Sequence, residues 1–168
     1  MQLAIETDLW QQATDHEPFA YAIFERQRPD YKIVRTDPSK PLAFDGWIMQ
    51  GKRKVALVET KCREHTYQDF TTKLKTQWLL SETKLAALAK CSRSWELPTY
   101  GFLYFINCKK LMTIQLVNRQ GIIINRELKT FLTKEKYLQT TDTRLCGLVA
   151  MHNATLLQWH GTPISKQE

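Results

Sequence analysis

The feature that most limits the possible folds is a short apolar run that continues, without a turn, into charged residues. Val55 to Val58 is a continuous apolar segment, and Glu59, Thr60 and Lys61 follow directly. A run of this kind is typical of a strand buried on both faces at the centre of a sheet. Because side chains two residues apart share a strand face, Glu59 and Lys61 point the same way. The sequence therefore predicts a charged pair at a strand end, where α/β sheets commonly place sites.

The segments around this run predict a mixed α/β protein, with helices packed on a mixed central sheet. Leu42 to Met49 is apolar and aromatic, and Gln50-Gly51-Lys52 supplies a turn before the Val55 segment, so we expect a hairpin. Tyr31 to Arg35 alternates like a short strand. Tyr100 to Ile106 is apolar enough to form a second buried strand. These segments define the expected sheet.

Helical spacing covers one region before the hairpin and one after it. The first spans Met1 to Arg28, with Asp15 as a candidate cap. The second begins near Leu74 and ends before Leu97, with apolar residues at steps of three or four. Smaller elements complete the prediction: a hairpin of residues 111–117 and 122–124, a short helix over 127–137, and a final hairpin of 145–151 and 155–159.

Length and composition limit the class of protein. A chain of 168 residues without a linker is expected to form one domain over residues 1–168. No apolar run approaches the ~18–20 residues that cross a bilayer, and the N-terminus lacks a secretory pattern, so we expect a cytoplasmic protein without a membrane partner. The cysteines are scattered without a C-x-x-C pair, which argues against zinc and iron–sulfur sites.

The charge balance bears on the kind of partner. The chain has 24 Lys and Arg residues against 17 Asp and Glu residues, a formal net charge of +7. A basic excess favours a polyanionic partner, nucleic acid first, although many basic proteins bind nothing acidic.

The hairpin brings a second carboxylate to the charged strand end. A turn centred on Lys52 places Asp45 directly opposite Glu59, with Cβ atoms about 4.5–5.5 Å apart. Two carboxylates this close repel each other unless a cation lies between them, and Mg²⁺ prefers oxygen ligands of this type. Lys61 would stabilise negative charge or position a water molecule. The alternative is a surface ion pair of Glu59 with Lys61, with Asp45 merely starting a turn.

The arrangement resembles the PD-(D/E)XK nuclease superfamily, which has an Asp on one strand and Glu-x-Lys on the next, within a restriction-endonuclease-like αβββαβ core. Asp45 and Glu59-Thr60-Lys61 stand at the matching places. The resemblance covers roughly residues 15–106 and leaves a C-terminal extension, 107–168, with extra β elements. The Pro that gives the motif its name is absent before Asp45, where Phe44 stands.

The resemblance implies metal-dependent hydrolysis of DNA phosphodiester bonds. Asp45, Glu59 and the carbonyl of Thr60 would hold Mg²⁺, or Mn²⁺ in its place, and Lys61 would orient the water or stabilise the transition state.

Further site residues follow from features that only some members of the superfamily have. An acidic residue on the first core helix completes the metal shell in many of them, which suggests Glu17, with Glu25 as the alternative. Some branches place a Gln or Lys on the helix after the motif, for which Lys84 and Gln77 are candidates.

DNA contacts are expected from basic, aromatic and amide side chains near the motif: Lys52, Arg53, Lys54, Arg63, Tyr67 and Gln77. For the basic run at the hairpin turn, a solvated turn is the competing interpretation. His65, just past the motif, is a weaker candidate for a substrate contact.

The resemblance is greatest to small phage or bacterial nucleases, and implies an endonuclease or resolvase-like enzyme in a bacterial or phage-infected cell. Such an enzyme would work as a homodimer, because cutting both strands needs two sites. The alternatives are an exonuclease or repair nuclease with the same chemistry, and a nucleic-acid-binding protein that keeps the fold without cleaving.

Overall fold

The central strand of the computed structural model, which describes residues 16–134 and 141–158, is the one that the apolar run predicts. β3 (Arg53–Arg63) contains that run and pairs with β2 (Gly46–Gln50) on one side and β5 (Thr99–Phe105) on the other. The side chains of residues 56–58 are at most 3% exposed. The prediction of a central strand buried on both faces is therefore confirmed.

Within the described residues, six strands form one mixed sheet in the order β1-β2-β3-β5-β6-β9, called the large sheet below. β1 (Tyr31–Arg35), β6 (Lys110–Val117) and β9 (Thr155–Gln158) complete it. Neighbouring strands are antiparallel except β3 and β5, which are parallel. A parallel pair needs a crossover, and the chain between β3 and β5 supplies it with α2 (Tyr67–Thr72), β4 (Gln77–Ser81) and α3 (Glu82–Trp95).

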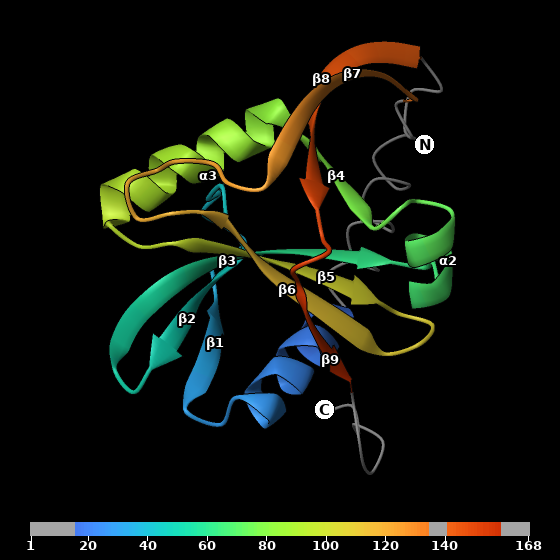
Figure 1. Cartoon of the computed structure of the whole chain (residues 1–168). Helices are drawn as coiled ribbons and strands as arrows, with labels where there is room; N and C mark the ends of the chain where they lie inside the picture. The colour runs from blue at the N-terminus through green and yellow to red at the C-terminus, as the bar shows by residue number, and fades with distance from the viewer. Residues whose placement is uncertain (1–15, 135–140, 159–168) are drawn as a thin grey trace.

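Helices cover both faces of the large sheet, as Figure 1 shows. The described part of the N-terminal helix, residues 16–27, packs Ala20 and Ile23 against one face, and α3 packs Leu85 and Leu88 against the other. Successive side chains of a strand alternate between faces. From Ala56 onward, the even-numbered residues of β3 therefore face the N-terminal helix and the odd-numbered residues face α3. The expected mixed sheet flanked by helices is confirmed.

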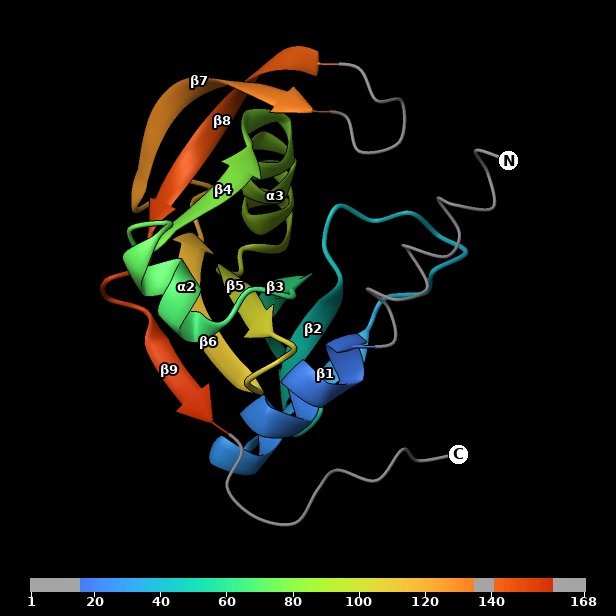
Figure 2. The same ribbon diagram turned by 90° about the vertical axis from the view of Figure 1, so that its right-hand side faces the viewer.

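A small sheet lies beside α3 (Figure 2). Within the described residues it has three antiparallel strands in the order β4-β8-β7, with β7 at Arg126–Lys134 and β8 at Thr141–Ala150. α3 packs closely on it, because a Cβ added at Gly147 of β8 would lie 2.5 Å from a methyl carbon of Leu85. None of the helices in the described part of the chain is long and apolar enough to cross a membrane.

The helix predicted from Leu74 is wrong over its first residues. Residues 77–81 form strand β4, in which Trp78 and Leu80 are buried and Leu79 is 40% exposed. The spacing of Leu74 and Trp78 fits a helix, but residues 78–80 alternate as a strand does. Ser81 is the N-cap of α3 and accepts a hydrogen bond from the backbone N of Lys84, so the helix begins only after it.

The predictions for the C-terminal third are wrong in detail, although extra β elements are indeed present. Residues 126–134 form strand β7 where a helix was expected, and residues 122–124 contribute only the bridge between Val117 and Ile123. β8 pairs with β4 and β7, while β9 pairs with β6, so 145–151 and 155–159 form no hairpin with each other. Asp15, residues 135–137 and Trp159 lie outside the described residues.

Candidate active site

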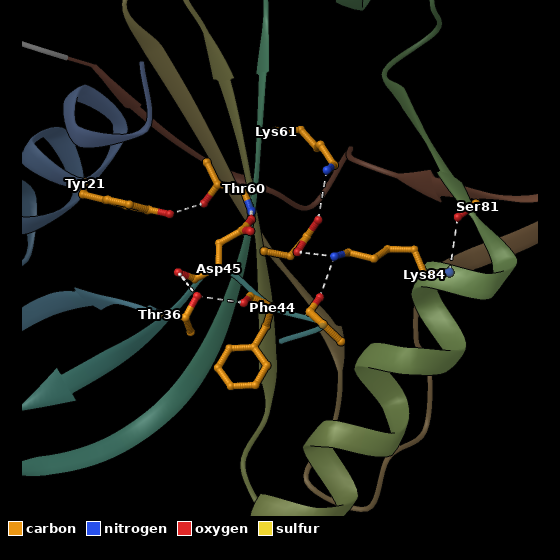
Figure 3. Close-up of polar contacts among 10 residues, drawn as sticks. Tyr21, Thr36, Phe44, Asp45, Thr60, Lys61, Ser81 and Lys84 are labelled. Atoms are coloured by element: carbon orange, nitrogen blue, oxygen red, sulfur yellow. Dashed lines mark hydrogen bonds and ion pairs between the residues drawn. The ribbon is translucent and has the colours of Figure 1, made fainter. Parts of the chain in front are cut away.

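Asp45 lies beside β3 at the point where β2 begins. Gly46 pairs with Val58, which is the register predicted for this hairpin, and the backbone N of Asp45 donates to the carbonyl of Val58 at 2.8 Å. The Asp45 carboxylate then accepts a hydrogen bond from the backbone N of Thr60 at 2.7 Å (Figure 3). A bulge between Ile48 and Met49 shifts the register only nearer the turn. Asp45 therefore lies next to the Glu59-Thr60-Lys61 segment, as predicted.

The backbone around Asp45 is fixed from the opposite side by Thr36. The Thr36 backbone N donates to the Asp45 carbonyl at 2.9 Å, and its hydroxyl lies 3.1 Å from the same oxygen. Gly46 follows, and a Cβ there would lie 2.9 Å from the carbonyl oxygen of Val34. The close approach of β1 thus requires glycine at position 46 and holds the Asp45 carboxylate against β3.

Glu59 is a fully buried carboxylate with two cationic partners. Its side chain is 0% exposed, and its oxygens lie 3.1 Å from Nζ of Lys61 and 3.0 Å from Nζ of Lys84. A buried charge is tolerated only when it is paired. Burial raises the pKa of Glu59 most, and Asp45 adds to the rise, while the two lysines oppose it. The site thus contains a carboxylate that needs a cation to stay ionised.

The two lysines reach Glu59 from different elements. Lys61 is two residues further along β3, on the same face. Burial lowers its pKa, but attraction to Glu59 and Asp45 outweighs this and leaves the pKa above its usual value, so Lys61 is a cation at neutral pH.

Lys84 lies in the first turn of α3 and also donates to the carbonyl of Ala43 at 2.5 Å (Figure 3). A cation near a helix N-terminus opposes the helix dipole, so this position is explained by the charge of Glu59 rather than by helix stability.

The N-terminal helix brings Glu17 to the opposite side of Asp45. Glu17 and Asp45 line the same pocket of about 390 Å³, and Glu17 accepts a hydrogen bond from Arg35 at 2.9 Å. Burial, followed by repulsion from Asp45, raises the pKa of Glu17 to about 7, against the opposing effects of Arg35 and Lys61. Glu17 is therefore close enough to Asp45 for the two carboxylates to repel each other.

The alternative acidic residue, Glu25, lies elsewhere. It accepts a hydrogen bond from the backbone N of Ile33 at 2.8 Å and pairs with Lys32 at 3.5 Å. Glu25 thus holds β1 against the N-terminal helix, and of the two candidates only Glu17 lies at the site.

Lys52, Arg53 and Lys54 do not lie beside the site, which corrects the expected placement. They lie at the turn and the start of β3, five to seven residues before Glu59. At a strand rise of about 3.3 Å per residue, this places them roughly 16 Å or more from Glu59. The ammonium of Lys54 lies 4.1 Å from the ring of Trp47 and 4.8 Å from that of Trp95. The Lys54 ammonium thus makes cation–π contacts with these two rings.

The other side chains predicted to contact DNA are Arg63, Tyr67 and Gln77, which follow the Glu59-Thr60-Lys61 segment in the chain. Arg63 and Gln77 line a further pocket together with His65. Tyr67 packs edge-on against Phe105, with Nζ of Lys110 located 4.9 Å from its ring centre.

The site contains two residues that the sequence does not predict there. Tyr21 lies one helical turn after Glu17, and its hydroxyl is 2.8 Å from that of Thr60 in a buried hydrogen bond (Figure 3). This contact ties the N-terminal helix to β3. The sequence predicts Arg35, the partner of Glu17, only as the last residue of a strand. The four-residue spacing of Glu17 and Tyr21 was a usable signal, whereas nothing in the sequence pairs Arg35 with Glu17.

The atoms at the site that could bind a metal ion are all oxygens, which are the ligands that hard divalent cations prefer. The N–H and the C=O of one strand residue point toward the same neighbouring strand. The Thr60 N–H donates to the Asp45 carboxylate, so the Thr60 carbonyl also points toward Asp45. One lysine ammonium lies beside each oxygen of Glu59, which leaves further lone pairs of the carboxylate for a metal ion. The described residues contain no group of three or more Asp, Glu, His or Cys side chains that could hold a metal ion. A metal would thus be held by few side chains and several waters.

The pKa of Glu17 makes a prediction about stability. A carboxyl group whose pKa is higher in the folded than in the unfolded state loses folding stability as pH rises between the two values. Without divalent metal, the wild-type protein should lose about 1–3 kcal/mol relative to Glu17→Gln between pH 5 and pH 8. Urea unfolding at each pH measures this, with Glu25→Gln on the same helix as control. A wild-type minus Glu17→Gln difference independent of pH would contradict the assignment.

Comparisons with protein-family models, with curated proteins and with solved structures found no match for this chain.

Proposed function

We propose that the chain is a metal-dependent DNA nuclease of the PD-(D/E)XK type. The observation that carries this proposal is the convergence of Asp45, Glu59 and Lys61 at one point of the sheet, with the fully buried Glu59 carboxylate held between two lysines. A surface ion pair, the competing interpretation, would not bury Glu59 completely. It would also not bring a lysine from α3 onto the same carboxylate.

The order of elements supports the same proposal. The N-terminal helix, β1, β2, β3, α3 and β5 follow one another in the αβββαβ order of that superfamily, with α2 and β4 inserted before α3. The parallel pairing of β3 with β5 places the end of β3 beside a strand of the same direction. Side chains at such strand ends commonly form sites in α/β sheets.

The chain's own groups divide the work of phosphodiester hydrolysis. Asp45, Glu59 and the Thr60 carbonyl would hold Mg²⁺ or Mn²⁺, with Glu17 on the far side of Asp45. The metal would supply charge neutralisation at the phosphate and an activated water. Lys61, as a cation next to Glu59, orients the water or stabilises negative charge in the transition state. Lys84 positions Glu59 by pairing with its other oxygen.

The partner proposed is DNA, held through the excess of basic residues that gives the chain its net charge of +7. Binding of this kind weakens as salt concentration rises, because it releases counterions from the phosphates. An endonuclease or resolvase-like activity on duplex DNA would need two sites, and therefore a homodimer. An exonuclease or repair nuclease would use the same site as a monomer.

The experiment that tests the function is cleavage by the purified wild-type protein. Linear, circular, single-stranded and branched DNA are incubated with Mg²⁺, with Mn²⁺ or with EDTA. The proposal predicts cutting of at least one substrate in either metal and none in EDTA. Cutting of circular DNA would identify an endonuclease, and cutting of linear DNA alone an exonuclease. Binding without cutting in both metals would contradict the proposal and favour a non-cleaving nucleic-acid-binding protein.

A further inference from the structure

A further pocket adjoins the candidate site at the end of β3. It has a volume of about 530 Å³, within the 300–1,000 Å³ typical of small-ligand sites. Its walls are mostly apolar and come from α2, β4, β5 and β8, and its polar groups are those of Arg63, His65 and Gln77. Leu103, which lines it, is paired with Lys61 in the sheet register. The pocket therefore begins directly beside the catalytic lysine.

Arg63 continues the line of the site residues. It lies two residues beyond Lys61 on the same face of β3, about 7 Å further along the strand. It is half-buried, and burial lowers its pKa. One guanidinium N–H donates to the carbonyl of Cys62 at 3.1 Å. In the described part of the chain, no carboxylate lies within ion-pair distance of this guanidinium. A partly buried cation without an anionic partner is suited to bind an anion at the mouth of the pocket.

The wall next to the active site is the indole of Trp78. Its ring packs over Gly101, where a Cβ would lie 2.5 Å from the ring, and Gly101 is the residue paired with Glu59. Trp78 is 2% exposed, and its buried Nε1 has no hydrogen-bond acceptor among the described residues. The pocket thus combines an aromatic side chain in its wall, the polar side chains of His65 and Gln77, and a cation.

We propose that this pocket receives an unpaired nucleobase of the DNA strand held in the candidate active site, with Arg63 bound to the adjoining phosphate. The proposal rests on the nuclease function proposed above. A flat ring with polar edges next to an anion is the chemistry of a nucleotide, and it complements the pocket walls and Arg63. Bases within a duplex are stacked and paired, so only an unpaired base can enter. The preferred substrate is therefore single-stranded DNA, or duplex DNA with a flap or frayed end at the cut.

The test measures DNA binding in EDTA, where no cutting occurs. The probe is fluorescein-labelled oligothymidine of about 12 nucleotides, within the range of known single-strand site sizes, and affinity is read from anisotropy. A set of the same oligonucleotides carries one abasic nucleotide, moved one position at a time. Leu79→Glu adds a negative charge at the pocket, at a side chain 40% exposed. Leu156→Glu on β9 makes the same change at a side chain 39% exposed and away from the pocket.

The proposal predicts that Leu79→Glu weakens oligothymidine binding about tenfold, and that Leu156→Glu changes it less than about twofold. Gln77→Ala, which adds no charge, weakens binding in the same direction, and thermal unfolding checks that each variant is folded. In the wild-type protein the abasic scan shows a loss at one position, and Leu79→Glu removes that loss. A flat scan, or equal effects of the two Glu variants, would overturn the proposal and assign the pocket to another ligand.

The cleavage assay separates this proposal from the proposed function. Metal-dependent cutting by the wild-type protein together with a flat abasic scan would leave the nuclease function standing and reject the base-binding pocket. A position-dependent scan without cutting in Mg²⁺ or Mn²⁺ would reject the nuclease function while supporting a site for an unpaired base.

Discussion

Replacing Lys61 by Met is expected to slow DNA cutting in Mg²⁺ by about 10²–10⁴-fold while leaving DNA affinity in EDTA within about threefold of the wild-type value. The reason is that Lys61 is a cation held 3.1 Å from Glu59, where it would meet charge that develops at the phosphate. Single-turnover cleavage of one labelled DNA measures the rate, and anisotropy measures the affinity.

The matched control for this variant is Lys73→Met. Lys73 is an exposed lysine on the segment after α2, paired with Asp69 at 3.2 Å and outside the site. The same loss of positive charge there should leave the cutting rate within about twofold, because surface ion pairs contribute little. Equal rates for Lys61→Met and Lys73→Met would remove Lys61 from the catalytic residues.

The second large effect concerns stability and needs no DNA. The double variant Lys61→Met with Lys84→Met leaves Glu59 fully buried without a cation, and should cost about 3–5 kcal/mol of unfolding free energy at pH 8. Burial raises the pKa of Glu59, so part of the loss should be recovered at lower pH, where the carboxyl group takes up a proton. Urea unfolding at pH 5 and pH 8 measures both effects.

Two controls make this result specific. Adding Glu59→Gln to the double variant should restore most of the stability at pH 8, because the buried charge is then gone. Glu59→Gln alone should cost less than the double variant, because the side chains of Lys61 and Lys84 are 37% and 27% exposed and reach water. A double variant as stable as the wild type at pH 8 would show that Glu59 does not depend on the two lysines.

The part of the site that could be predicted from sequence is the part made by local structure. Asp45 and Glu59 belong to one hairpin. Its turn pairs Gln50 with Arg53, one residue away from the predicted register, and the bulge between Ile48 and Met49 restores the predicted pairing of Gly46 with Val58. Glu17 and Lys84 were predicted from the superfamily resemblance, because the residues alone give no contact between the N-terminal helix, α3 and β3. The structure brings both to the site, Lys84 by an ion pair with Glu59 and Glu17 by its proximity to Asp45.

The parts that were mispredicted depend on distant partners. Residues 77–81 have spacing that suits either a helix or a strand, and only pairing with β8 decides between them. Residues 126–134 are a strand because they pair with the same β8. The pocket beside Lys61 was missed for the same reason, since β4 supplies Gln77 and Trp78 to it. Long-range strand pairing, which is encoded only weakly in local patterns, therefore limited the prediction.

The most direct measurement of the central claim is the rate at which wild-type protein and Asp45→Asn cut the same DNA in Mg²⁺. Asp45→Asn keeps the shape of the side chain and its acceptor oxygen for the Thr60 N–H while removing the charge that a metal would need. Asp69→Asn on α2 is the same substitution at an exposed surface carboxylate outside the site. We expect wild type and Asp69→Asn to cut DNA in Mg²⁺ and to stop cutting in EDTA, and we expect no measurable cutting by Asp45→Asn. Undiminished cutting by Asp45→Asn would contradict this expectation.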